Sequence, residues 1–360
     1  MNRLPGIYRR AAAFLLSACL LTLSGCGQQP IAGTDNAVAE ADTSATICPD
    51  FAQVKPKYIF TYAENQSADF PTSLAAFRFA YSVHERTRGA IQIRVYTDSE
   101  LGDETDMYKE LMYGGVDFMR ASLSGLTQYN ATTSVLVMPY LYESSQHMWE
   151  VLDGDIGQTI MDSFEGTGMV ALSWYDSGAR SFYMREPIYS LEDMKDKVIR
   201  IQDSVIMEDM IRRLGAIPLA LEYDEIYAAL QVGRVDGAEN NFPSYESRGH
   251  NEVAPYYILD EHTRVPELQL ISQSTYDRLT EDERRIIREC AQESAVYERE
   301  LWAKWEEQAR KKVLDDGCTI ITLSEEELDK FQKAILPIYE TYCSDYMDLL
   351  EQIRAVAEKP

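Results

Sequence analysis

The hydrophobic pattern from Lys57 onward alternates between two kinds of segment. Short β-like runs, such as 57–64 (KYIFTYAE) and 90–97 (AIQIRVYT), predict strands. Longer runs with helical spacing follow them at 72–89 and 103–115, and both contain a glycine at or near their end. This alternation predicts an α/β fold with mostly parallel sheets.

A much longer helical run occupies 279–317. It opens with a capping box formed by Thr280 and Glu283, and a second box, Ser324 with Glu327, opens the last helices. About 36 helical residues would reach about 50 Å, which exceeds the width of one lobe. A coiled coil is the alternative, but the apolar spacing is not a clean heptad. We therefore expect a helix that lies across two lobes.

The motif Tyr-x-x-Leu-x-x-Gly-x-Val-Asp occurs twice, at 107–118 (MYKELMYGGVDF) and at 226–237 (IYAALQVGRVDG). Each copy predicts a helix packed through Tyr and Leu, a glycine that ends it, and a strand. The repeat indicates a related unit in each of two lobes. Arg120 and Glu239 occupy matching positions just beyond the shared strand start, where α/β sheets bind ligands, so we expect both at a common crevice.

The N-terminus predicts export and a lipid anchor. Residues 1–25 combine a basic start with an apolar run too short to span a bilayer comfortably, which is typical of a signal peptide. Leu23, Ser24, Gly25 and Cys26 form a lipobox-like sequence, so we expect cleavage before Cys26 and acylation of its thiol. An uncleaved signal anchor is the alternative. Residues 26–50 predict a flexible tether, and the protein is then extracytoplasmic and attached to the membrane.

Charge narrows the choice of partners. The formal net charge is −25, and removal of the three arginines of residues 1–25 makes it −28. A chain this acidic lacks the basic stripe that nucleic-acid binding needs. If it binds an anion, it does so through local arginines, against its own long-range field.

No catalytic motif is present. The chain has no HExxH, GxSxG, Walker or GxGxxG sequence, so no nucleophile, base, cofactor or metal ligand can be nominated, and we expect no enzyme. A secreted carbohydrate-active enzyme with a carboxylate pair is the alternative class. Cys48, Cys290, Cys318 and Cys343 form no CxxC, and their disulfide pairing is open.

Two arginines within predicted apolar strands indicate that the protein binds an anion. Arg200 lies in 196–204 (DKVIRIQDS), on the same predicted face as Gln202, and Arg180 enters a second β-like run. A buried arginine is costly unless an anion meets it. A structural salt bridge is the alternative. Guanidinium groups bind carboxylates with two parallel hydrogen bonds, which suits an organic acid.

The order of three segments resembles the solute-binding proteins of tripartite ATP-independent periplasmic (TRAP) transporters. These segments are 178–183 (GARSFY), 191–204 (LEDMKDKVIRIQDS) and 214–241 (LGAIPLALEYDEIYAALQVGRVDGAENN). The resemblance runs from Lys57 to the C-terminus. It implies a monomeric two-lobed clamshell of the periplasmic-binding-protein type, which delivers an organic acid anion to membrane permease subunits. A sensory lipoprotein on the same fold is a further alternative.

The same resemblance implies the lobes and the long helix. Lobe I would comprise 51–176 and 266–305, and lobe II would comprise 177–265 and 306–360. The C-terminal helix would span both lobes.

Matching positions imply ligand contacts in the second lobe. Arg200 corresponds to the family arginine that pairs with the ligand carboxylate, Arg180 to a second arginine near the ligand, and Asn240 to an asparagine that hydrogen-bonds it. The family often has proline where Asn241 stands, so Asn241 adds a candidate amide ligand. Gln202 and Glu239 complete the predicted set.

First-lobe contacts are predicted at Glu64 and Asn65, with turn formation as the alternative. Arg120 would add a guanidinium suited to a polyhydroxylated acid, and its alternative role is a charge partner for Glu239 across the cleft. The sequences AENN, RAS and 250–267 (HNEVAPYYILDEHTRVPE) resemble the sugar-acid branch of the family. Hexuronates such as glucuronate or galacturonate are therefore favoured, with C4-dicarboxylates and sialic acid as alternatives.

Overall fold

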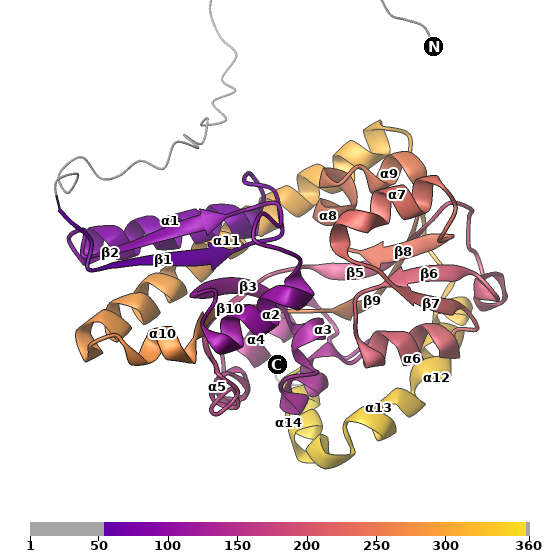
Figure 1. Cartoon of the computed structure of the whole chain (residues 1–360). Helices are drawn as coiled ribbons and strands as arrows, with labels where there is room; N and C mark the ends of the chain where they lie inside the picture. The colour runs from indigo at the N-terminus through magenta and orange to yellow at the C-terminus, as the bar shows by residue number, and fades with distance from the viewer. Residues whose placement is uncertain (1–53, 358–360) are drawn as a thin grey trace, which may run out of the picture. The chain divides into compact units, whose positions relative to one another are not determined.

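The strands of the computed structural model, which describes residues 54–357, form two mixed sheets (Figure 1). The first has the strand order β2-β1-β3-β10-β4, and the second has the order β11-β9-β5-β8-β6-β7. The strands of the first sheet are β1 (Tyr58–Ala63), β2 (Ile91–Tyr96), β3 (Phe118–Ser122), β4 (Met169–Tyr175) and β10 (Glu267–Ser272). Those of the second are β5 (Ala179–Met184), β6 (Val198–Ile201), β7 (Ile217–Ala220), β8 (Gly237–Asn240), β9 (Tyr256–Arg264) and β11 (Thr319–Ile321).

Both sheets contain parallel pairs. β1 is parallel to β2 and β3, β6 is parallel to β7 and β8, and β9 is parallel to β11. The antiparallel strands are those through which the chain changes sheet. The chain passes from β4 in the first sheet directly to β5 in the second, and from β9 in the second sheet directly back to β10 in the first. β5 and β10, the strands that follow these crossings, are antiparallel to their neighbours β8 and β3.

Helices fill the connections between the strands. The α-helices are α1 (Pro71–Arg86), α2 (Glu104–Tyr113), α3 (Leu123–Leu126), α4 (Ser145–Leu152), α5 (Asp155–Asp162), α6 (Val205–Arg213), α7 (Ile226–Gln231), α8 (Phe242–Ser247), α9 (His250–Val253), α10 (Gln273–Asp277), α11 (Glu281–Asp315), α12 (Glu325–Ile335), α13 (Pro337–Tyr342) and α14 (Met347–Ala357). Short 3-10 helices are η2 (Ala131–Val137), η3 (Leu191–Met194), η4 (Tyr223–Glu225) and η5 (Ser344–Tyr346).

The repeated motif has matching backbone geometry in the two sheets. Gly114 after α2 and Gly233 after α7 both take the left-handed conformation, with φ of 79° and 73°. The aspartates that follow make equivalent hydrogen bonds. Asp117 accepts from the backbone N–H of Thr61 in β1 at 2.9 Å, and Asp236 accepts from that of Val198 in β6 at 2.8 Å.

The tyrosines of the motif differ. Tyr108 is buried and donates to the carbonyl of Ser122, as expected for a packing residue. Tyr227 is only half-buried, and its hydroxyl donates to Glu252 on a neighbouring helix. The prediction of packing through Tyr is therefore correct for the first copy only.

The long helix α11 contacts both sheet regions. It packs against α1 of the first region and α8 of the second (Figure 1), and also against β4 of the first region. Thr280 and Glu283 form the predicted reciprocal capping box. At the next cap, Ser324 accepts from the backbone of Glu327 as predicted, but the Glu327 carboxylate accepts from Leu191 and Lys330 instead.

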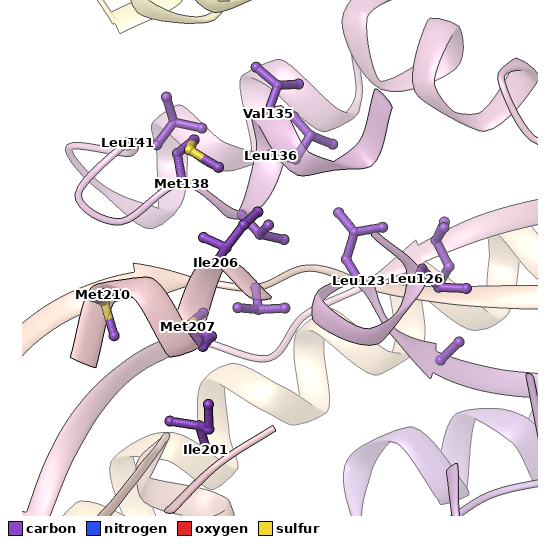
Figure 2. Close-up of a cluster of buried hydrophobic side chains, with 14 of the residues drawn as sticks. Leu123, Leu126, Val135, Leu136, Met138, Leu141, Ile201, Ile206, Met207 and Met210 are labelled. Carbon is purple, nitrogen blue, oxygen red and sulfur yellow. The ribbon is translucent and has the colours of Figure 1, made fainter. Parts of the chain in front are cut away.

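A hydrophobic cluster joins segments that are distant in the sequence. Figure 2 shows side chains of α3, of η2 and of the loop after it packed against Ile201 and α6. α12 and α13 also contact α6, whereas α14 contacts α4 and α5. The assignment of these residues to lobes stays a prediction. Cys290, Cys318 and Cys343 are buried free thiols, and Cys48 lies outside the described residues.

Candidate ligand-binding site

A cavity of about 380 Å³ lies between the two sheets and takes lining residues from both. Several of these residues stand at the carboxyl ends of strands. Asn65 follows β1, Gln202 follows β6, Glu222 follows β7, and Asn240 ends β8. Parallel strands place such residues at one edge of a sheet, which is the usual ligand position in α/β folds.

Arg200 on β6 is a buried cavity-lining arginine, with 3% of its surface exposed. Its Nε and Nη2 donate to the carbonyl oxygen of Leu221 at 3.0 and 2.8 Å. A guanidinium carries five N–H donors. Both hydrogens of Nη1 and one of Nη2 are left over, and Nη1 has no hydrogen-bond partner within residues 54–357.

The charge of Arg200 is also uncompensated. Arg120 and Arg180 form ion pairs with carboxylates, and Arg200 forms none within the described chain. Burial is the main reason that the pKa of Arg200 lies below its ordinary value. A bound anion would stabilise this charge, and the open edge of Nη1 and Nη2 suits a carboxylate with two parallel hydrogen bonds.

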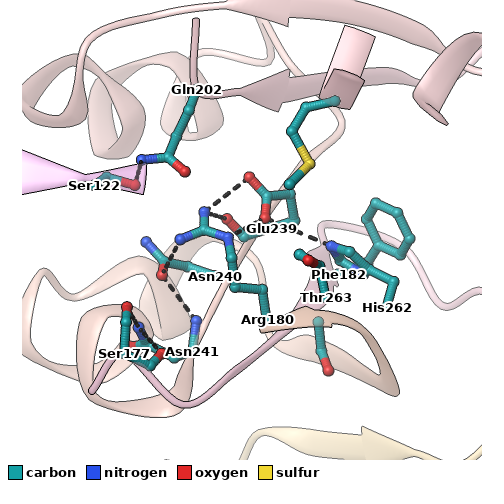
Figure 3. Close-up of polar contacts among 12 residues, drawn as sticks. Ser122, Ser177, Arg180, Phe182, Gln202, Glu239, Asn240, Asn241, His262 and Thr263 are labelled. Carbon is teal, nitrogen blue, oxygen red and sulfur yellow. Dashed lines mark hydrogen bonds and ion pairs between the residues drawn. The ribbon is translucent and has the colours of Figure 1, made fainter. Parts of the chain in front are cut away.

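Arg180 on β5 lines the same cavity but is already paired (Figure 3). Its Nε and Nη2 donate to the two carboxylate oxygens of Glu239 at 2.5 and 2.8 Å, and its Nη1 donates to Asn240 Oδ1 at 3.0 Å. β5 and β8 are antiparallel neighbours, which places these side chains together. Arg180 thus contributes little net charge to the cavity.

Glu239 has a second cationic neighbour in His262 (Figure 3). The Nε2 of His262 lies 3.5 Å from Glu239, and its Nδ1 lies 3.0 Å from Asp260. Burial by itself would lower the pKa of His262, but Asp260 and Glu239 outweigh it and raise this pKa from 6.5 to about 9. Burial would likewise raise the pKa of Glu239, but Arg180 and His262 lower it to about 2.

The two shifts define a pH window. The folded pKa of His262 lies above its unfolded value, so its stabilisation is complete below about pH 6.5 and is lost as the pH rises through about 9. The folded pKa of Glu239 lies below its unfolded value. Its stabilisation is therefore present above about pH 4.5 and is lost as the pH falls towards about 2.

Arg120 on β3 lies in a buried acidic cluster. Its Nε and Nη2 donate to Glu64 at 3.0 and 2.7 Å, and Nη2 also donates to Asn65. Its Nη1 lies 3.2 Å from Glu104 and 2.9 Å from Glu267. The alternative prediction that Arg120 pairs with Glu239 is therefore wrong. β10 is the neighbour of β3 in the sheet and brings Glu267 to Arg120, while Glu239 is held by Arg180.

Carboxyl groups crowd this side of the cavity. Burial, followed by the charges of Glu104 and Glu64, raises the pKa of Glu267 to about 7 in spite of Arg120. Burial and the nearby Asp103 also raise the pKa of Glu222.

Hydrogen bonds between described residues join the two sheet regions at the cavity. Gln202 Nε2 donates to Ser122 Oγ at 3.1 Å (Figure 3). Thr105 Oγ1 donates to Glu222 Oε1 at 3.1 Å. Gln128 and Arg248 donate to the backbone carbonyls of Asp203 and Asn65. These bonds hold the two walls of the cavity together.

Three predicted residues do not line the cavity. Asn241 caps α8 by accepting from Ser244, and its Nδ2 donates to Ser177, so its amide groups are used within the protein. Glu64 and Glu239 are buried behind the cavity as partners of Arg120 and Arg180. Cys26 lies outside the described residues.

Other lining residues are absent from the sequence-based set, among them Glu222, Glu104 and Glu267. Glu222 follows the strand at 217–220, so the strand-end rule applied to Arg120 and Glu239 would have found it. Glu104 and Glu267 carry no such signal, because their approach to Arg120 depends on the packing of α2 and β10 around β3.

The described residues contain no group of three or more His, Cys, Asp or Glu that could hold a metal ion. Across residues 54–357, no helix combines the length and the apolarity needed to span a membrane.

Two α/β lobes around a polar cavity with a buried, uncompensated arginine define a solute-binding protein. The chain belongs to the family of bacterial extracellular solute-binding proteins, family 7 (DctP), whose model matches residues 62–345. It is 33% identical over 281 residues to a solute-binding protein of Chromohalobacter salexigens, covering 78% of this chain and 83% of that one.

Solved structures of TRAP periplasmic solute-binding proteins are also similar to this chain. A TRAP periplasmic solute-binding protein from Xanthobacter autotrophicus Py2 with bound β-D-galacturonate is 38% identical, with a TM-score of 0.80 and coverage of 82% of this chain and 99% of that chain. Another, from Pseudomonas putida F1 with bound D-glucuronate, is 31% identical, with a TM-score of 0.81 and coverage of 83% and 97%. The predicted TRAP family and the two-lobed α/β fold with a long C-terminal helix are confirmed.

Proposed function

We propose that this protein captures a hexuronate outside the cytoplasm and delivers it unchanged to the membrane permease of a TRAP transporter. The observation that carries the proposal is Arg200, a buried arginine that lines the cavity, with Nη1 unpartnered and no carboxylate partner in the described chain. The carboxylate of a sugar acid supplies the missing charge. The two similar structures with bound galacturonate and glucuronate support this ligand class.

The cavity also suits the rest of a sugar acid. Its volume of about 380 Å³ lies within the usual range for small-molecule sites. Asn240, Asn65 and Gln202 offer amide groups from its walls, and Glu104 and Glu267 offer carboxyl oxygens. Sugar hydroxyls both donate and accept, so they match a lining of this kind better than an apolar acid does.

Titration calorimetry tests the proposal. D-Galacturonate and D-glucuronate should bind, while D-galactose, which has the same ring without the carboxylate, should bind at least about 30-fold more weakly. Sialic acid and succinate complete the panel. Equal affinity for galactose and galacturonate, or binding of no sugar acid, would contradict the proposal.

Membrane attachment is the second part of the proposal. A lipid on Cys26 would keep the folded domain near its permease through the tether of residues 26–50. Cells that express the full chain and are fed labelled palmitate should incorporate the label into the protein, and replacement Cys26→Ala should abolish the label. An unlabelled original protein would argue against the lipid anchor and leave the ligand proposal intact.

A further inference from the structure

The cavity has three lining arginines, and two of them are already neutralised. Arg180 is paired with Glu239, and Arg120 is paired with carboxylates on more than one side. Arg200 is the lining arginine without a carboxylate partner in the described chain. Among the described residues that line the cavity, Arg200 is therefore the one arginine available to a ligand.

Arg120 cannot easily serve as a second anion site. Its Nε and Nη2 donate to Glu64, Nη2 also donates to Asn65, and Nη1 faces Glu104 and Glu267. A second ligand carboxylate would have to displace one of these buried partners. It would also meet the remaining carboxyl groups at close range, where like charges in a partly buried site repel strongly.

Acidic side chains also line the cavity beyond this cluster. Glu222 hydrogen-bonds Thr105 across the cavity, and Asp103 and Glu104 lie at the same end of α2 as Thr105. The raised pKa of Glu222, caused by burial and then by Asp103, shows that negative charge is already unfavourable here. Neutral hydroxyl groups can donate to these carboxylates, whereas another anion cannot.

We propose that the cavity accepts ligands with one anionic group and excludes diacids, and that Glu222 is a specificity-determining residue for this selection. The inference rests on the proposed function, because Arg200 must hold the single carboxylate. It narrows the ligand to polyhydroxylated monoacids, and it argues against C4-dicarboxylates and aldarates.

D-Gluconate and D-glucarate test this selection directly. They have the same hydroxylated carbon chain, and they differ only in a terminal alcohol on one and a carboxylate on the other. Each acid is titrated into the protein in competition with D-galacturonate. We expect gluconate to bind at least about tenfold more tightly than glucarate.

The variant Glu222→Gln removes the charge and keeps an oxygen that can accept from Thr105. It should strengthen glucarate binding roughly tenfold relative to gluconate. Glu300→Gln is the matched control. Glu300 is exposed on α11 and does not line the cavity, so its replacement makes the same change in net charge without changing the ratio.

The outcomes separate the two proposals. If galacturonate itself does not bind, the proposed function fails. If galacturonate binds and the original protein shows no preference for gluconate over glucarate, including the case in which neither open-chain acid competes, the selection for monoacids is wrong. If the affinity ratio of the two acids does not change in Glu222→Gln, the role of Glu222 is wrong.

Discussion

Replacement of Arg200 separates a ligand-binding role from a structural one. In Arg200→Met the side chain keeps much of its length and loses its charge. If Arg200 holds the ligand carboxylate, removal of one partner of a buried charged hydrogen bond costs about 2–5 kcal/mol. Affinity for galacturonate should then fall at least about 30-fold in a calorimetric titration.

Arg200→Met should reduce the free energy of unfolding of the ligand-free protein less than it reduces the free energy of galacturonate binding. Arg200 has no carboxylate partner in the described chain, so Met leaves no buried anion behind. The lost bonds to the Leu221 carbonyl cost about 1–3 kcal/mol, and relief of an uncompensated buried charge offsets part of this loss. Urea unfolding measures the net effect.

Arg180→Met is the matched comparison. It leaves Glu239 buried without its main partner, which should cost about 3–5 kcal/mol. We therefore expect Arg200→Met to lose mainly affinity and Arg180→Met to lose mainly stability. Unchanged affinity in Arg200→Met, or equal destabilisation in the two variants, would refute the reasoning.

Three further predictions concern the surroundings of the cavity. In urea titrations, the unfolding free energy of the original protein should fall by about 3 kcal/mol between pH 6.5 and about 9, as His262 loses its proton. His262→Asn should abolish most of this fall. Asp236→Ala should lower stability by about 1–2 kcal/mol through loss of its bond to Val198, with ligand affinity unchanged in calorimetry. Arg248→Met should release galacturonate roughly tenfold faster in stopped-flow measurements, because its bond to the carbonyl of the cavity-lining Asn65 joins the two sheet regions. A pH profile of stability that is unchanged in the His262 variant would contradict the first prediction. A large loss of affinity in the Asp236 variant would contradict the second, and an unchanged release rate in the Arg248 variant would contradict the third.

Much of the fold follows from local sequence pattern. The strands at 58–63 and 91–96 and the helix Glu281–Asp315 lie within one or two residues of the predicted segments. Gly114 and Gly233 show why helix ends can be predicted locally. A residue in the left-handed conformation is needed just after the helix, and glycine adopts it without strain. The half-exposed Tyr227 shows the limit of this reasoning, because its burial depends on which helix lies next to it.

The candidate site was predictable where it depends on strand ends. Asn65, Gln202 and Asn240 line the cavity, and each follows or ends a strand. Arg120 also lines it, but its ion pair with Glu267 follows from the antiparallel pairing of β3 with β10, which joins residues far apart in the sequence. No periodicity within either segment specifies that register.

Asn241 illustrates a different limit. The sequence predicts an additional amide ligand there, and the structure places the amide at the start of α8, bonded to Ser244 and Ser177. Asparagine is common both in binding sites and as a helix N-cap. The pattern of residues alone does not decide between these roles.

A crystal structure of the complex with D-galacturonate tests the central claim most directly. We expect the carboxylate oxygens within about 3 Å of Nη1 and Nη2 of Arg200, with the sugar ring inside the cavity. A carboxylate bound at Arg120 instead, or a ligand outside this cavity, would contradict the assignment.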